Sequence, residues 1–164
     1  TDIDLRGAKC AGVCFDEATL RGATLHGADL RGASFVKAVG ASAEFDDAQL
    51  DEADLRGAEL PMASFAGARC LRARFTRARL ERARFVRADL RGADLSLVAA
   101  RWLDLSHARL DQADASHGDF SGSLMHRTSA LETRWFDASL ADVTGTDPKL
   151  ALGEDFVPTR GGAA

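Results

Sequence analysis

The feature that most constrains the fold is a five-residue repeat that runs without a change of phase from Ile3 to Val143. Taking the central apolar residue of each five as position i, 20 of the 28 such positions between residues 5 and 140 are Leu or Phe. Position i−2 is equally restricted, because 20 of its 29 members between residues 3 and 143 are Ala. The unbroken phase predicts one continuous repeat array without an inserted loop.

A period of five fits neither a helix nor a straight strand. On an α-helix five residues advance about 140°, so the Leu/Phe row would spread around the cylinder. On a strand, successive i residues would point to opposite faces. The pattern is satisfied if the chain bends once per five residues, with i−2 and i inward and the other three positions outward. Four bends then close a square coil, in which Ala is used for its small size at an inner corner rather than for its helix propensity.

This repeat resembles the pentapeptide-repeat family, whose consensus A-(D/N)-L-x-x is met at Ala28–Gly32, Ala53–Gly57 and Ala88–Gly92. The resemblance implies an all-β fold, a right-handed quadrilateral β-helix (solenoid) of about seven 20-residue coils. We expect residues 1–143 to form this β-helix and residues 144–164 to form a C-terminal cap or tail. The β-helix would be a module of this protein or of a longer one.

Residues at position i recur on the same face every 20 residues and therefore predict the core. Larger residues at i−2, such as Leu103 and Thr128, and small ones at i, such as Ala115, predict looser or distorted coils from about residue 97 to 135. The predicted structural core comprises Leu5, Phe15, Leu25, Phe35, Phe45, Leu55, Phe65, Phe75, Phe85 and Leu95.

The sequence carries no motif for nucleotide binding, metal ligation or nucleophilic catalysis. Cys10, Cys14 and Cys70 are too few for a disulfide framework and lack the partner residues of a zinc site. A core filled with Leu and Phe leaves no ligand cavity. We therefore expect a non-enzymatic protein without cofactor or metal. The absence of a long apolar run predicts no membrane span, and no signal peptide is visible, so we expect a cytoplasmic protein, with delivery as a secreted effector as the alternative. The family resemblance implies a bacterial protein.

Charge is strongly segregated along the chain. Residues 69–91 carry nine Arg against two acids, whereas residues 44–59 carry seven acids against one Arg. Because each segment is about one coil, they form stacked belts, and the register predicts ion pairs of Glu52 with Arg72, Glu59 with Arg79 and Glu44 with Arg84, and places Arg74 between Asp54 and Asp94. Inter-coil ion pairing is the favoured interpretation, and a partner-binding belt is the alternative. The arginine belt consists of Arg69, Arg72, Arg74, Arg77, Arg79, Arg82, Arg84 and Arg87.

Several large apolar residues fall at outward positions, where exposure indicates a contact surface. The register stacks Met62, Arg82 and Trp102, so that the Arg82 guanidinium can lie over the Trp102 ring. Coverage of this surface by the C-terminal tail is the alternative. The candidate partner-contact patch comprises Trp102, Leu97, Met62, Arg82, Phe136 and Leu131.

These features favour a rigid scaffold for protein–protein interaction, acting as a monomer or weak dimer with a protein partner. The family resemblance implies an alternative, a quinolone-resistance type of protein that binds DNA gyrase by imitating duplex DNA. That role needs a strongly negative surface, which the arginine belt interrupts. Nucleic-acid binding through the arginine belt is less favoured, because acidic residues lie on both sides of it and no exposed aromatics alternate with the arginines.

Overall fold

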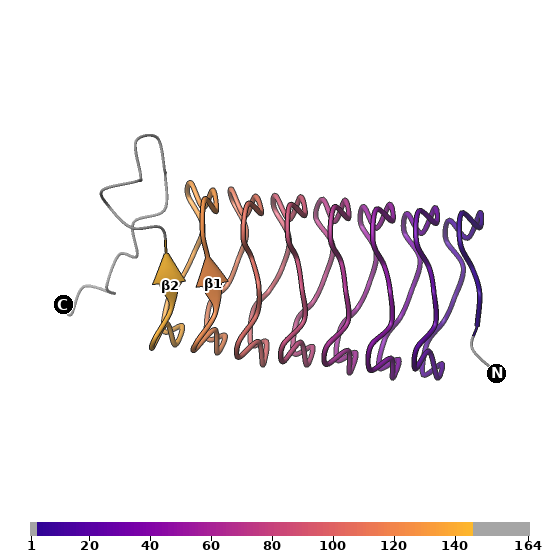
Figure 1. The fold of residues 1–164 in the computed structure, drawn as a ribbon, viewed down its shortest axis with the longest axis horizontal. Helices are drawn as coiled ribbons and strands as arrows, with labels where there is room; N and C mark the ends of the chain where they lie inside the picture. Colours follow the sequence, from indigo (N-terminus) through magenta and orange to yellow (C-terminus); the bar gives the residue numbers. More distant parts are fainter. Residues whose placement is uncertain (1–2, 146–164) are drawn as a thin grey trace.

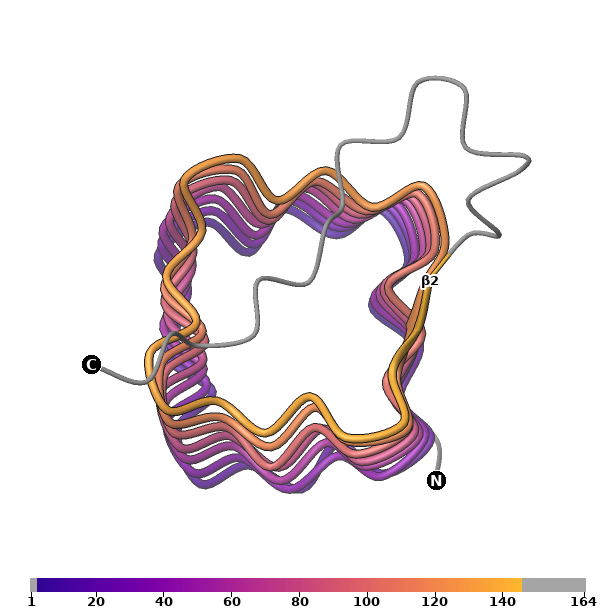
Figure 2. The ribbon, with the colours of Figure 1, turned by 90° about the vertical axis from the view of Figure 1, so that its left-hand side faces the viewer.

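The computed structural model describes residues 3–145, which wind into square coils stacked along one axis (Figures 1 and 2). The predicted right-handed quadrilateral β-helix is confirmed. Pairing consists mainly of single parallel bridges between residues 20 apart, from Asp4 with Thr24 to Asp119 with Ser139. Two short strands, β1 (Leu124–Met125) and β2 (Thr144–Gly145), pair in parallel with the same offset. Apart from its first two residues, the predicted cap or tail lies outside the described residues.

The backbone of each coil is hydrogen-bonded to the coils on both sides. Leu25 N–H donates to the Glu44 carbonyl of the next coil at 2.6 Å, and Glu44 N–H donates back to the Ala23 carbonyl at 2.9 Å. Within the coil, each bend is closed by a bond such as that from Ala28 N–H to the Leu25 carbonyl at 3.1 Å. The offset of 20 residues therefore fixes which side chains stack on one another.

The bends form four corner rows along the rod. Corner 1 contains residues 6–7 and every twentieth residue after them; corners 2, 3 and 4 begin in the same way at residues 11–12, 16–17 and 21–22. The second residue of each bend, position i+2, has a positive φ, in nine glycines and also in nineteen other residues with φ between 50° and 62°. A side chain in this left-handed region costs roughly 1 kcal/mol, so the non-glycine residues at the corners need a separate reason.

The core is a column of side chains from position i, surrounded by Ala at i−2 that is fully buried in most coils. Phe65 stacks between Phe45 and Phe85, with ring centroids 4.7 and 4.5 Å apart, and meets Phe75 edge to face at 5.9 Å. Of the ten predicted core residues, eight are buried, whereas Leu5 and Phe15 in the first described coil are only partly buried.

The expectation of looser or distorted coils between residues 97 and 135 is wrong for the stacking of the coils, although the bend-closing bonds at Leu103 and Gly118 lengthen to 3.3 Å. The bridges continue through this segment without a change of offset, and Leu103, Ala115 and Thr128 are all buried. One reason is exchange of volume between neighbouring positions: where position 118 is Gly, the Phe120 ring occupies the space, with Cε2 only 2.6 Å from where a Cβ would lie.

Hydroxyl groups are the second reason why these coils stay regular. The Thr128 hydroxyl donates to the carbonyl of Leu105, 23 residues earlier, at 2.8 Å. A polar side chain can therefore occupy the inner corner, because its hydroxyl is satisfied by the backbone of the preceding coil. The same bond is made by Ser123 to Ala100 and by Thr133 to Leu110.

Candidate interaction surfaces

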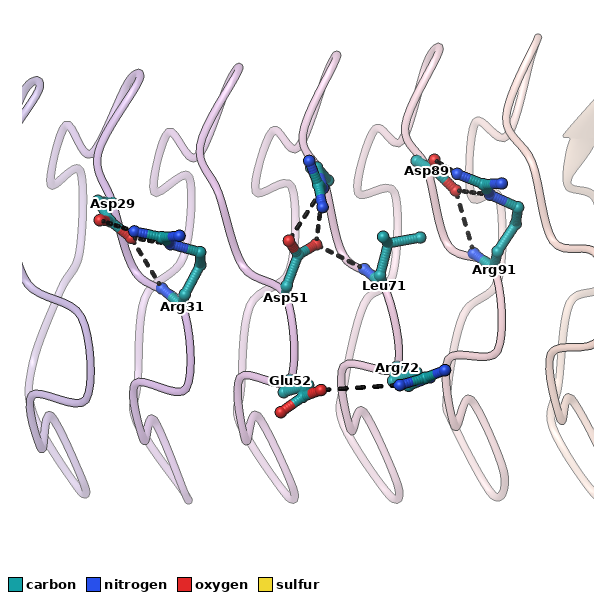
Figure 3. Close-up of polar contacts among 9 residues, drawn as sticks. Asp29, Arg31, Asp51, Glu52, Leu71, Arg72, Asp89 and Arg91 are labelled. Carbon is teal, nitrogen blue, oxygen red and sulfur yellow. Dashed lines mark hydrogen bonds and ion pairs between the residues drawn. The ribbon is translucent and has the colours of Figure 1, made fainter.

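The outer faces carry ion pairs within single coils that the register argument did not predict. Arg31 donates from Nε and Nη2 to the Asp29 carboxylate at 2.8 and 2.7 Å, and Arg91 binds Asp89 in the same way at 2.7 and 2.6 Å (Figure 3). These hydrogen bonds from Arg31 hold the pKa of Asp29 below its usual range. The available signal was the D-L-R in the repeat, because residues two apart on an extended chain point to the same side.

Ion pairs between coils confirm part of the predicted set. Arg72 lies 3.9 Å from Glu52 (Figure 3), and Arg79 lies 3.8 Å from Glu59. These pairs are exposed, so each contributes about 0–1 kcal/mol.

The other predicted inter-coil pairs differ in the structure. Arg74 lies 3.6 Å from Asp54, but within residues 3–145 no ion pair joins it to Asp94. The predicted pair of Glu44 with Arg84 is wrong, because these residues are 40 apart and Ser64 bridges to each of them in the coil between.

The arginine belt encircles the rod, with four members on the sides and four at the corners, and every one is exposed. Arg69, Arg72, Arg74 and Arg79 have a carboxylate within 4.0 Å. Among the described residues, the remaining four have none: Arg77, Arg82, Arg84 and Arg87. The belt therefore interrupts the negative surface on all four sides of the rod and leaves half of its own charges without an ion pair there.

Trp102 is held at corner 4 between two cations. As predicted, the Arg82 guanidinium lies over the indole, 5.4 Å from the ring centroid, and Arg101 lies at the same distance. The ring extends over Gly122, where an added Cβ would lie only 2.6 Å from Trp102 Cδ1. The contacts of Trp102 with Arg101 and Gly122 were not predicted from the sequence, although Gly122 stands 20 residues after Trp102. The indole is thus fixed in orientation and still 53% exposed.

The six residues of the candidate patch lie on three different corners. Met62, Arg82 and Trp102 share the row of corner 4, and Leu97 occupies corner 3. Phe136 also belongs to corner 3, in the last coil, where its ring meets His117 edge to face at 5.3 Å. Leu131 lies at corner 2. The structure thus brings together the first three residues but does not place all six on one face.

Nothing in residues 3–145 has the arrangement of a metal site or of an activated nucleophile. No group of three or more His, Cys, Asp or Glu side chains converges among these residues. Burial raises the pKa of the Cys70 thiol, which keeps it protonated and unreactive. This described part of the chain also contains no helix long and apolar enough to cross a membrane.

Two hollows on the described surface lie at glycine positions in the corner rows. One, of about 450 Å³, surrounds Leu71 and Gly92 at corner 2, where Arg69 donates to Asp51. A second, of about 570 Å³, surrounds Gly57 at corner 3. Both are open depressions between charged side chains.

Comparison with solved structures finds related rods. The chain is 31% identical to a pentapeptide repeat protein from the thylakoid lumen of Arabidopsis thaliana, with a TM-score of 0.56 over 58% of this chain and 67% of that one. QnrB1, a plasmid-mediated fluoroquinolone resistance protein, is 18% identical with a TM-score of 0.41, covering 90% of this chain and 93% of that one. HetL, a pentapeptide repeat protein involved in heterocyst differentiation regulation from the cyanobacterium Nostoc, is 22% identical with a TM-score of 0.28 over 86% of each chain. The last two are too distant to inform the surface of this rod.

No curated protein matches the chain. The family model described as pentapeptide repeats matches in eight copies, over residues 1–35, 20–57 and 58–96, which together are more than half of the 164 residues. With the square coil and the offset of 20 residues, this match makes the chain a member of the pentapeptide repeat family.

Proposed function

We propose that this protein is a non-enzymatic scaffold that binds a protein partner through exposed apolar side chains at its corners. The observation that carries the proposal is the placement of Met62, Leu97 and Trp102 at corner positions with φ of 57–59°. Each is about half exposed, at 54, 45 and 53%. Partial burial and the cation–π contacts of Trp102 offset some of the cost of a positive φ, but each residue keeps about half of its apolar surface in water in a backbone conformation that favours glycine.

Most of the nineteen non-glycine residues with this conformation are charged or polar, so large apolar side chains that stay exposed there are more typical of a contact surface than of a structural role. The position of Trp102 between Arg82 and Arg101 supports a role in partner binding, because an indole held in this way loses little side-chain entropy when a partner covers it. Trp and Arg are also the residues most enriched among energetically dominant interface contacts. The rod would then act as a rigid support that presents these side chains at fixed spacing.

The proposal is tested by the double variant Leu97→Asp, Trp102→Asp. Asp is suited to these positions, since Asp47 and Asp137 adopt φ of 55° and 54° at equivalent corner sites, so folding is preserved. Proteins captured by the unmodified chain should be lost by the double variant and retained by Gln112→Asp, which changes an exposed residue of corner 2. Circular dichroism checks that all three chains keep the β-helix. Retention of every captured protein by the double variant would exclude this surface.

The gyrase-binding alternative receives less support, because the arginine belt breaks the negative field that imitation of DNA requires. If the purified chain changes DNA supercoiling by gyrase, or the sensitivity of gyrase to quinolones, that alternative replaces the one proposed here.

A further inference from the structure

Corner 3 contains a gap in its row of side chains, flanked by two cations. The row begins with Glu17 and continues through Lys37, Gly57 and Arg77 to Leu97, each 20 residues after the last. Gly57 has φ of 66°, and the space over its Cα is open except for Lys37, whose Cγ would lie 3.6 Å from an added Cβ. Because successive coils are about 4.8 Å apart, Lys37 and Arg77 face each other across a gap of two coil spacings.

Neither cation at this gap is neutralised. Within the part of the chain that the structure describes, no carboxylate lies within 4.0 Å of Lys37 or Arg77. The other two cations that line the hollow, Arg56 and Arg74, share the Asp54 carboxylate, at 2.7 and 3.6 Å. Asp94, at the rim, is engaged by the hydroxyl of Thr76 at 2.7 Å. The hollow of about 570 Å³ thus has an excess of positive charge that its own carboxylates do not offset.

Corner 1 has a gap of the same kind, but the two side chains that flank it carry charges of opposite sign. There Gly67 lies between Asp47 and Arg87, and the Asp47 carboxylate leans into the space over the glycine. An acid and a base therefore face each other across the gap at corner 1, whereas two bases do so at corner 3. Two like charges across a gap repel each other, and an anion bound between them removes that repulsion.

We propose that the gap between Lys37 and Arg77 binds a carboxylate carried by an acidic segment of a protein partner. The proposal deepens the proposed function and rests on it, because Leu97 is the next residue of the row and would contact an apolar side chain of the same segment. A single carboxylate suits the hollow, since Asp94 lines it and Asp54 pairs with two of its arginines, and both disfavour the higher charge of a phosphate. The acidic coil beside the belt likewise disfavours a nucleic-acid strand.

Gly57→Asp is the most direct test, because it supplies the missing carboxylate from the chain itself. Asp adopts this conformation at the equivalent position of corner 1, where Asp47 has φ of 55°. Gly92→Asp is the matched control: its φ is 65°, the net charge changes equally, and it lies at corner 2. We expect Gly57→Asp to raise the thermal unfolding midpoint above that of Gly92→Asp.

Binding is measured with two acetylated and amidated peptides, one alternating Glu and Ser and one alternating Glu and Leu, at low salt and up to millimolar concentration. Titrations are followed through the side-chain Nε–Hε NMR signals of Arg77 and Arg87. Both peptides should shift the Arg77 signal and leave that of Arg87 in place. Gly57→Asp and Lys37→Gln should weaken binding about tenfold, the loss expected for one charge-assisted contact. Gly92→Asp and Arg87→Gln should change it by less than about twofold.

Several results would overturn the assignment: no shift with either peptide, equal weakening by Gly92→Asp, or stronger binding of inorganic phosphate or single-stranded DNA than of the peptides. The Leu97→Gln variant separates this inference from the proposed function, because Gln removes the apolar contact without adding a carboxylate beside Arg77, and Gln112 adopts the same backbone conformation with φ of 61°. It should abolish only the advantage of the Glu–Leu peptide over the Glu–Ser peptide, while binding of Glu–Ser still depends on Gly57. If Leu97→Gln changes neither peptide, the carboxylate site stands and the apolar contact fails.

Discussion

Two regions of the rod fill the same inner corner in different ways. In the strict coils, residues 20–97, every i−2 residue is Ala and the volume of the core comes from Leu and Phe at i. In the variant coils, residues 98–140, the i−2 positions also hold larger or hydroxylated residues such as Leu103 and Thr128. Both regions keep the same offset of 20 residues. The fold therefore tolerates different volumes at its inward positions, as in Leu103 with Leu105 and Ala113 with Ala115, provided that the backbone groups are satisfied, and the consensus residues are one way of meeting this condition.

The outer faces of the two regions also differ, in the residue that binds the aspartate at i−1. In the strict coils an aspartate at i−1 binds an arginine two residues later, as in Asp89 with Arg91. In the variant coils the same position binds a serine, as when Ser106 N–H donates to Asp104 at 3.0 Å. Aspartates at i−1 are thus anchored in both regions, by serine already at Asp94 in the strict coils, and the arginine partners of the strict coils add a second exposed charge. The following substitutions test how much each of these differences contributes to the free energy of unfolding.

The largest effect should come from the aromatic stack of the strict coils. Phe65→Ala removes a fully buried ring that contacts rings on both sides and should lower the free energy of unfolding by about 3–5 kcal/mol, measured by urea denaturation. Phe65→Leu keeps apolar burial and loses only ring packing, at about 1 kcal/mol. Equal losses for the two variants would show that the stack, rather than volume, stabilises this region.

Placing threonine at an i−2 position that is followed by Leu at i, the pairing found in the strict coils, should cost less. Ala108→Thr places threonine directly before Thr128 in the same row, but beside Leu110 rather than the smaller Ala130, and overpacking should cost about 1–3 kcal/mol. Adding Leu110→Ala should give a double variant more stable than the sum of the two single losses predicts. Strict additivity in urea denaturation would refute the exchange of volume between i−2 and i.

Thr128→Val tests how much the Thr128 hydroxyl contributes to the free energy of unfolding. The substitution keeps the volume and removes the donor to the Leu105 carbonyl, so the free energy of unfolding should fall by about 0.5–1.5 kcal/mol. The Leu105 carbonyl retains its bond from Ala108 N–H at 2.9 Å, which limits the loss. A stabilising effect of Val would mean that the hydroxyl is tolerated rather than used.

The smallest effect should come from Arg91→Ser, which converts a strict surface pair into the variant form. Burial raises the pKa of Asp89, but the hydrogen bonds from Arg91 outweigh it and hold that pKa below its usual range. A lowered folded-state pKa stabilises the fold above about pH 4 and loses this contribution as the pH falls. The substitution should therefore cost at most about 1 kcal/mol at neutral pH and nothing in acid. A cost that persists in acid would contradict the ion pair as its cause.

The fold and most of the core were predictable because one register governs them. The spacing of Ala and of Leu or Phe set the bends, the stacks of i residues and the position of Arg82 over Trp102. The regularity of the variant coils was not predictable, because volume exchange and the Thr128 hydroxyl bond depend on contacts with the preceding coil. The pairing of Asp29 with Arg31 was not predicted, because the offset of 20 residues relates side chains in different coils and says nothing of residues two apart in the same coil.

The candidate surfaces were predictable only as exposed positions. The register placed Leu97 and Trp102 outward, but their backbone strain and the second cation on the indole became visible only in three dimensions. The gap at Gly57 depends on where the Lys37 side chain leans, which no pattern of residue types encodes.

The constant offset of 20 residues also has a genetic consequence. Loss or duplication of any 60-nucleotide stretch within the repeat removes or adds one whole coil and rejoins the backbone in phase, wherever the breakpoints fall. Removal of residues 53–72, for example, would stack Glu52 directly on Gly92 in the same corner row. A gene of this kind can change the length of its rod and rearrange the sequence of charges along each corner in a single recombination event, without having to design a new core.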